Sequence, residues 1–197
     1  MTDSEQTRRG DNRGDKRGRL VESASRLLHE QGVSSTTLAD VAKDADVVVG
    51  NIYYYFKTKD DLVQAVIDAH ADSIRAALAA LDQDPDPRAR LKGFVRGLAA
   101  SGEYAARFGC PHGTLCSELG KREDGMDRAS AAMMTLYVQW AQQQFRLLGK
   151  DETAAHDHAV TFVSVYQGAS LLANTFRDPG LMAAQARQLD AWIDTVV

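Results

Sequence analysis

Apolar residues recur every three to four positions along almost the whole chain, and this periodicity limits the fold to packed helices. Leu20, Ala24 and Leu28 show it first, on one face of a helix that Gly32 ends. No segment alternates apolar and polar residues as a half-buried strand would. We therefore predict an all-α chain of about nine helices and no sheet.

Capping and breaking residues divide the periodic pattern into separate helices. Thr37 with Asp40, and Thr58 with Asp61, have the spacing of capping boxes at two helix starts. Pro111 suits a first helical turn, where a missing N–H group costs nothing. The predicted helices span residues 20–31, 37–45, 51–56, 58–82, 87–108, 111–121, 125–148, 151–176 and 179–196.

Charge is unevenly divided along the chain. The 197 residues carry a net charge of −4, which by itself disfavours nucleic acid as a partner. Residues 1–59 hold 10 basic and 9 acidic side chains, a net charge of +1, whereas residues 60–197 hold 13 and 18, a net charge of −5. We expect residues 1–15, which are polar and rich in glycine, to form a flexible basic arm.

The composition is that of a globular protein, with 44% hydrophobic and 25% charged residues. No apolar run approaches the roughly 18 residues that span a bilayer, and the first residues lack the apolar core of a signal peptide. Cys110 and Cys116 provide no disulfide framework. We therefore expect a cytoplasmic protein with no membrane partner.

Two short helices joined by a tight turn within residues 36–56 follow a longer helix, as in a helix-turn-helix unit. The second short helix carries three adjacent tyrosines, whose side chains point around its whole circumference. We expect Ile52, Tyr55 and Phe56 to face inward. Tyr53 and Tyr54 would then present their hydroxyl groups outward, where phosphate oxygens can accept hydrogen bonds.

Residues 19–65 closely resemble the DNA-binding head of TetR-type transcriptional repressors. The resemblance rests on TTLADVAKDA at 36–45 and on GNIYYYFKTKDDL at 50–62. It implies a homodimer, each subunit having a three-helix DNA-binding domain (residues 16–58) and a helical ligand-binding and dimerisation domain (residues 59–197). It also implies that the second short helix enters the major groove of a palindromic operator, and that a small molecule in the larger domain releases the DNA.

The resemblance assigns the contacts with double-stranded DNA residue by residue. Asn51 is the base-reading candidate, because an Asn amide can form two hydrogen bonds with adenine. Val48 or Val49 is expected to contact a thymine methyl group, and we predict that Val49 is the one that faces the groove. Further contacts are expected from Arg13, Arg17, Thr36, Thr37, Tyr53, Tyr54, Lys57 and Lys59. Thr37 is equally well explained as a helix cap alone.

The turn between the two short helices departs from the family pattern. The family usually has Gly at position 46, a small hydroxyl residue at 48 and often a basic or polar residue at 49. Here Asp46 must form the turn, and Val48 cannot accept the amide hydrogen bond that a Ser would accept. One alternative is therefore a head that has lost DNA binding and acts through protein contacts.

Apolar and aromatic side chains crowd three helices of the larger domain, and most of them are expected in its core. Because helical bundles build ligand sites between their helices, we also predict a site for a small apolar or aromatic effector. Its candidate residues are Phe94, Leu98, Phe108, Cys110, His112, Met133, Tyr137, Trp140, Phe162, Tyr166, Gln167 and Asn174. No metal or cofactor is expected, since Cys110 and His112 are too few ligands for a metal site.

Cys110 has two interpretations. As the residue before Pro111 it would be the N-cap of a helix, where a thiol becomes more reactive and could sense electrophiles or oxidants. The favoured interpretation is a small buried hydrophobic residue. An enzyme that uses Cys110 and His112 is less favoured, because no nucleophile, base and orienting group have a clear spacing.

The last two predicted helices, 151–176 and 179–196, combine alanine-rich faces with larger apolar side chains. Helices of this kind can pair across a two-fold axis into a four-helix bundle between subunits. We therefore predict a homodimer formed by these two helices. Its apolar area would come from Leu171, Leu172, Leu181, Leu189, Trp192 and Ile193.

Overall fold

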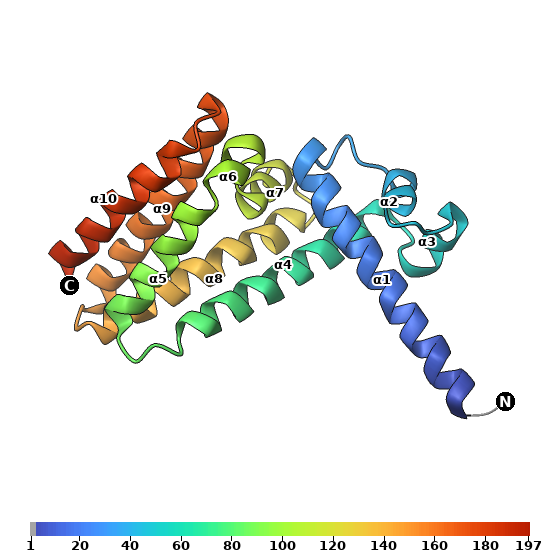
Figure 1. Cartoon of the computed structure of the whole chain (residues 1–197), viewed down its shortest axis with the longest axis horizontal. Helices are drawn as coiled ribbons and strands as arrows, with labels where there is room; N and C mark the ends of the chain where they lie inside the picture. Colours follow the sequence, from blue (N-terminus) through green and yellow to red (C-terminus); the bar gives the residue numbers. More distant parts are fainter. Residues whose placement is uncertain (1–2) are drawn as a thin grey trace. The chain divides into compact units, whose positions relative to one another are not determined.

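The computed structural model describes the backbone of residues 3–197 and the side chains of residues 15–197. Every regular element in this part of the chain is a helix, which confirms the all-α prediction (Figure 1). The ten helices are α1 (Asp3–Gln31), α2 (Leu38–Asp44), α3 (Val49–Tyr55), α4 (Lys59–Leu81), α5 (Pro87–Ala100), α6 (Gly102–Phe108), α7 (Pro111–Leu119), α8 (Met126–Leu147), α9 (Glu152–Phe176) and α10 (Gly180–Val196).

The chain divides into two compact units, Met1–His70 and Ala71–Val197, here called the head and the body. Helix α4 runs through both units, and the predicted boundary at residue 58 lies just before it begins. The head core is built from apolar side chains of four helices: Leu20, Ala24, Leu28, Val41, Ala42, Ile52, Phe56, Leu62, Val63 and Val66. The predicted basic arm lies, apart from Asp15, outside the described side chains.

Both predicted capping boxes are present in the head. At the start of α2, the Asp40 N–H donates to Thr37 Oγ1 at 3.1 Å and the Thr37 N–H donates to Asp40 Oδ2 at 3.0 Å. At the start of α4, the Asp61 N–H donates to Thr58 Oγ1 at 3.1 Å and the Thr58 N–H donates to Asp61 Oδ2 at 2.9 Å. These bonds satisfy helix-terminal amides that would otherwise lack partners. They fix both ends of the segment that carries α3.

The turn between α2 and α3 uses the left-handed backbone that was expected of Asp46, whose φ is 52°. The next residue returns to the core, because the Val47 N–H donates to the Ala42 carbonyl at 2.8 Å and its side chain is buried. Val48 is the N-cap of α3, and its side chain makes no capping hydrogen bond. Helix α3 is therefore held to the head mainly by its buried residue Ile52.

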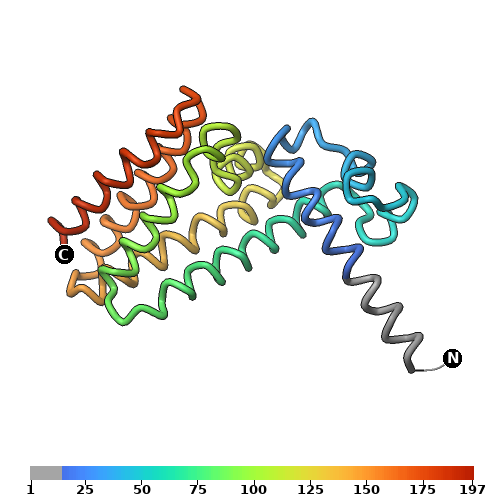
Figure 2. Tube along the Cα trace, in the orientation of Figure 1, coloured from blue at the N-terminus to red at the C-terminus, as the bar shows by residue number. Residues whose placement is uncertain are grey.

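The body is a helical bundle around α9, which packs against α6, α8 and α10. Helix α5 packs against α8 and α10, and α7 packs against α8. The Cα trace in Figure 2 shows α8, α9 and α10 as long neighbouring helices that alternate in direction. Their large buried side chains fill the interior of the body: Met133, Phe145, Phe162, Met182, Leu189 and Ile193.

The single helix predicted over 87–108 is instead two helices, α5 and α6, because the backbone breaks at Ser101. Both the N–H and the hydroxyl of Ser101 donate to the Leu98 carbonyl, at 3.1 and 2.8 Å. Gly102 then lies against the turn before α10, where a Cβ atom would be 2.8 Å from the Pro179 carbonyl oxygen. The break therefore accommodates a contact with a distant part of the chain.

Candidate functional site

One face of α3, including its N-cap, is open to solvent. Four large side chains on it are 43–72% exposed, and the amide side chain between them is exposed as well. They are Val48, Val49, Asn51, Tyr53 and Tyr54. All five were predicted to contact DNA, and all five are exposed on this short helix and its N-cap; together they are here called the α3 face. Apolar and aromatic groups gathered in this way on the outside of a protein are typical of an interaction site.

Basic side chains lie beside the α3 face. Lys57 is exposed, and its Nζ donates to a backbone carbonyl of α3 at 2.8 Å. Lys59 Nζ donates to a carbonyl of the loop between α1 and α2 at 3.4 Å. The exposed Arg17 guanidinium lies over the ring of Phe56, 5.3 Å from its centroid. These contacts hold three predicted phosphate-binding cations on the head.

The structure does not support Thr36 as a DNA contact. Its side chain is 1% exposed, and its hydroxyl donates to the Gly32 carbonyl at 2.8 Å and accepts from Gln31 Nε2 at 3.3 Å. Thr36 therefore stabilises the loop after α1. The exposed Thr37 hydroxyl is part of the capping box, which explains this residue without DNA. Arg13 lies outside the described side chains.

Two acidic residues border the turn before α3. Arg26 forms an ion pair with Asp44, and this hydrogen bond holds the pKa of the Asp44 carboxyl below its ordinary value. Asp46 is exposed and places a negative charge beside Val48. The turn thus adds a charge that opposes the cations around the α3 face.

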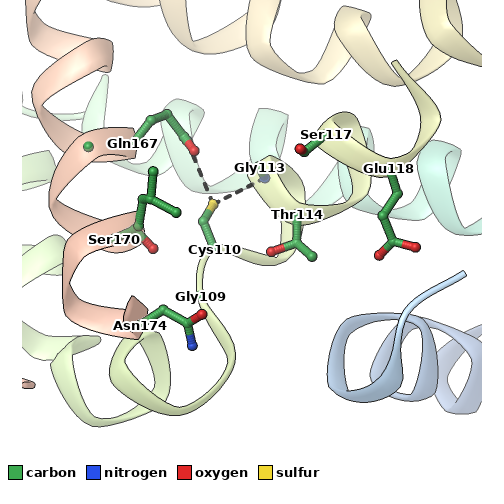
Figure 3. A pocket seen from close by; sticks show the side chains of 11 residues that line it. Gly109, Cys110, Gly113, Thr114, Ser117, Glu118, Gln167, Ser170 and Asn174 are labelled. Carbon is green, nitrogen blue, oxygen red and sulfur yellow. Dashed lines mark hydrogen bonds between the residues drawn. The ribbon is translucent and has the colours of Figure 1, made fainter. Parts of the chain in front are cut away.

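The body contains a cavity of about 490 Å³ between α7 and the C-terminal part of α9 (Figure 3). Its walls are Gly109, Cys110, Gly113, Thr114, Ser117, Glu118, Gln167, Gly168, Ser170, Leu171 and Asn174. Three predicted ligand residues, Cys110, Gln167 and Asn174, are among them. Thr114 and Ser170 were missed, although Ser170 follows Gln167 and precedes Asn174 at the spacing of one helix face.

Cys110 lies in the wall of this cavity and is the N-cap of α7, as predicted. Its Sγ accepts from the Gly113 N–H at 3.4 Å and from Gln167 Nε2 at 3.6 Å, and it lies 3.0 Å from the Tyr166 hydroxyl. Burial raises the pKa of Tyr166, so its hydroxyl keeps its proton at neutral pH. The thiol is buried and held by these three groups.

Most of the other predicted ligand residues fill the interior of the body instead of lining this cavity. The ring of Phe94 lies 5.2–5.9 Å from four other aromatic rings, and the remaining residues pack around this cluster or along α5 and α6. The four rings around Phe94 belong to Tyr137, Trp140, Phe162 and Tyr166. The remaining residues are Leu98, Phe108, His112 and Met133. Because the rings occupy the centre, the cavity lies at the edge of the bundle.

Helix α9 carries an exposed apolar face whose side chains are 42–66% exposed: Val160, Leu171, Leu172 and Phe176. Leu189 and Ile193, which were expected at a dimer interface, are instead buried within the body. The apolar surface open to a partner therefore comes mainly from α9.

The side chains of residues 15–197 contain no group of three or more His, Cys, Asp or Glu residues arranged to hold a metal ion. Among the described helices, none has the length and apolar character that crossing a membrane requires.

A helix-turn-helix head with an exposed second helix, followed by a helical body with a cavity, defines the class of DNA-binding regulators. Comparison with known proteins makes the class specific. Residues 20–66 match the family model of bacterial regulatory proteins of the tetR family, and residues 87–188 match the C-terminal domain of LmrA/YxaF-like transcriptional regulators. The chain belongs to the TetR family of transcriptional regulators.

Similar proteins include the regulator TtgR of Pseudomonas putida, 40% identical over 35% of this chain and 35% of TtgR. AcuR of Cereibacter sphaeroides is 33% identical over 64% of this chain and 59% of AcuR. The chain thus spans about a third of the length of the first relative and less than two thirds of the second. The crystal structure of a TetR regulator from Chloroflexus aurantiacus shares the fold, with a TM-score of 0.81 and 20% identity over 95% of this chain and 96% of that one. These relatives are transcriptional regulators and not enzymes.

Proposed function

We propose that this protein is a ligand-responsive repressor that binds a palindromic operator as a homodimer in the cytoplasm. The observation that carries the proposal is the α3 face, whose valine, asparagine and tyrosine side chains point to solvent beside three cations. A small apolar or aromatic effector in the body would release the DNA.

Each group on the α3 face has a chemical role in this proposal. Asn51 reads an adenine in the major groove, and Val48 or Val49 contacts a thymine methyl group. Tyr53 and Tyr54 donate their hydroxyl hydrogens to phosphate oxygens. The basic residues Arg17, Lys57 and Lys59 supply the salt-dependent part of the affinity.

The dimer is supported by the apolar face of α9. Exposed Leu171 and Phe176 are each about two thirds open to solvent, which is costly for apolar side chains of this size. Pairing of α9 and α10 with the same helices of a second copy would cover them. A two-fold dimer would also match the symmetry of a palindromic operator.

A second candidate function is sensing of electrophiles through Cys110. It is favoured by one observation, namely that the thiol lies in the wall of the cavity at the N-cap of α7. An electrophile that enters the cavity would react with this thiol before it reacts with the neighbouring hydroxyl groups, because a thiol is intrinsically more nucleophilic than a hydroxyl.

The proposed function is tested by fluorescence anisotropy with a duplex taken from the DNA upstream of the protein's own gene, titrated over a range of salt concentrations. We expect a steep fall of affinity with salt, since each phosphate contact adds about 0.9 to the slope of log K against log salt concentration. The Lys59→Ala variant should lower that slope by about 1 for each head. The matched control is Lys121→Ala, which removes an exposed charge from the body.

Absence of salt-dependent binding to any duplex would favour a head that acts through protein contacts. An equal loss of slope in the Lys59 and Lys121 variants would refute the assignment of the contact to the head.

A further inference from the structure

The hydroxyl of Ser170 stands out among the groups that line the cavity. The side chain is 1% exposed, and its Oγ has no hydrogen-bond partner in the structure. Thr175, five residues further along α9, shows the usual arrangement, since its hydroxyl donates to the Leu171 carbonyl at 2.8 Å. Ser170 does not form such a bond. A buried hydroxyl without a partner is destabilising, so a hydrogen-bonding group from outside the chain would stabilise Ser170.

The groups around Ser170 define what that partner can be. The carboxamides of Gln167 and Asn174 lie on the same helix, and each uses one N–H within the chain: Gln167 Nε2 donates to Cys110 Sγ and Asn174 Nδ2 donates to the Ala106 carbonyl at 3.3 Å. The opposite wall adds the hydroxyl of Thr114 (Figure 3). Apart from Glu118, both walls therefore present neutral hydrogen-bonding groups.

The charges of the lining residues limit the charge that a ligand can carry. None of the eleven lining residues is a Lys, Arg or His, and one of them, Glu118, carries a carboxylate. An anionic ligand would lose its hydration in this cavity without gaining a cation, which is strongly unfavourable. The Cα groups of three glycines and the side chain of Leu171 provide apolar contact for the rest of a ligand.

We propose that the cavity between α7 and α9 binds a small molecule without an anionic group, through a hydroxyl or carbonyl group that forms a hydrogen bond with Ser170. This inference deepens the proposed function, on which it rests, by naming the chemical class of the effector. It excludes carboxylates and phosphate esters from this cavity.

The test is a fragment screen of the full-length protein by ligand-observed NMR. The library contains equal numbers of neutral alcohols and ketones and of carboxylates on the same one-ring and two-ring frameworks. We expect the neutral members to bind and the carboxylates to fail. Isothermal titration calorimetry of the best neutral fragments should show about 5–10-fold weaker binding to the Ser170→Ala variant, the loss of one hydrogen bond.

The matched control is Ser164→Ala, an exposed serine on the same helix that does not line the cavity. It should leave fragment affinity unchanged. Ser170→Ala should not lower the free energy of unfolding, because the hydroxyl it removes has no partner. Carboxylates that bind as well as neutral fragments, fragments insensitive to Ser170→Ala, or an absence of neutral fragments that bind would each overturn the inference.

Operator binding measured on the same samples separates this inference from the proposed function. Neutral fragments that require Ser170 but leave the DNA bound would support the site and argue against an effector role. An effector that releases the DNA equally well from wild type and Ser170→Ala would support the repressor and overturn this site.

Discussion

A hydroxyl residue at position 48 should stabilise α3. Val48 is the N-cap of that helix, with φ −55° and ψ 126°, and its side chain forms no capping bond and is 72% exposed, so a substitution loses little packing. A Ser or Thr hydroxyl at an N-cap accepts from the amide two or three residues on, here Gly50 or Asn51. Such a cap contributes about 1 kcal/mol relative to Ala. We therefore expect Val48→Ser and Val48→Thr to stabilise α3 by about this amount, and Val48→Ala to leave it unchanged.

Amide hydrogen exchange by NMR measures this effect within α3 itself. A gain of about 1 kcal/mol slows exchange about fivefold where the helix opens locally. The amide of Ile52 is the probe of choice, because its side chain anchors α3 to the head. Amides of α2 serve as the internal reference and should exchange at the same rate in all variants. Equal exchange at Ile52 in the Ser, Thr and Ala variants would refute the claim that a missing cap limits the stability of α3.

The same three variants test the role of Val48 on DNA. Thr retains a methyl group that can contact thymine and also adds the cap, whereas Ser adds only the cap. If Val48 makes the thymine contact, operator affinity should fall in the order wild type or Val48→Thr, then Val48→Ser and Val48→Ala. Identical operator affinities of all these variants would leave Val49 as the residue that contacts the thymine methyl group.

Four further outcomes are expected. Asp46→Asn should keep the left-handed turn and raise operator affinity about twofold per head, because it removes the repulsion between the carboxylate and a phosphate, about 0.4 kcal/mol for two charges roughly 10 Å apart in water. Asp46→Ala should lower the free energy of unfolding in urea by about 1 kcal/mol, because Ala tolerates the left-handed backbone poorly. Unchanged operator affinity in Asp46→Asn would place Asp46 away from phosphate. Leu171→Glu combined with Phe176→Glu should yield a monomer in light scattering, and a persistent dimer would argue against α9 as the interface. Mass spectrometry should show that iodoacetamide modifies Cys110 at least about tenfold more slowly in the folded than in the urea-unfolded chain, because the thiol is buried. Rapid modification of the folded protein together with release of DNA would favour the electrophile sensor. Burial lowers the pKa of His70, so below about pH 6.5, the ordinary pKa of histidine, the unfolded chain binds a proton more readily than the folded one. The free energy of unfolding should therefore decrease as the pH falls through this range, and it should decrease less in His70→Gln. Equal pH profiles of the two proteins would contradict this.

Local signals were sufficient for most of the fold. The two capping boxes at Thr37 and Thr58 are present because each depends on residues three positions apart. The left-handed turn at Asp46 follows from the few residue types that tolerate that backbone. The helical spacing of apolar residues continues through 87–108 and masks the break at Ser101. The Ser101–Gly102 dipeptide is a weak local turn signal, and the contact that accompanies the break is with Pro179, far away in the sequence.

The burial and exposure of side chains could be predicted less well in the body than in the head. On α3, exposure follows from helix geometry once Ile52 is placed in the core. In the body, composition cannot distinguish rings that surround a cavity from rings that fill the interior, and Phe94 and Phe162 proved to be of the second kind. Thr36 was misassigned for a related reason, since its hydroxyl bonds to the carbonyl four residues before it, and this satisfies the group inside the fold.

The aromatic cluster of the body also makes it optically distinct from the head. Both tryptophans of the chain, Trp140 and Trp192, belong to the body, whereas the head contains only Phe and Tyr rings. Trp140 donates to Asp82 Oδ1 at 2.9 Å, and its ring contacts Phe94, which in turn contacts Tyr166 beside the cavity thiol. Fluorescence excited near 295 nm therefore reports on the body alone, so that a single cuvette can follow effector binding without interference from the unfolding or DNA contacts of the head.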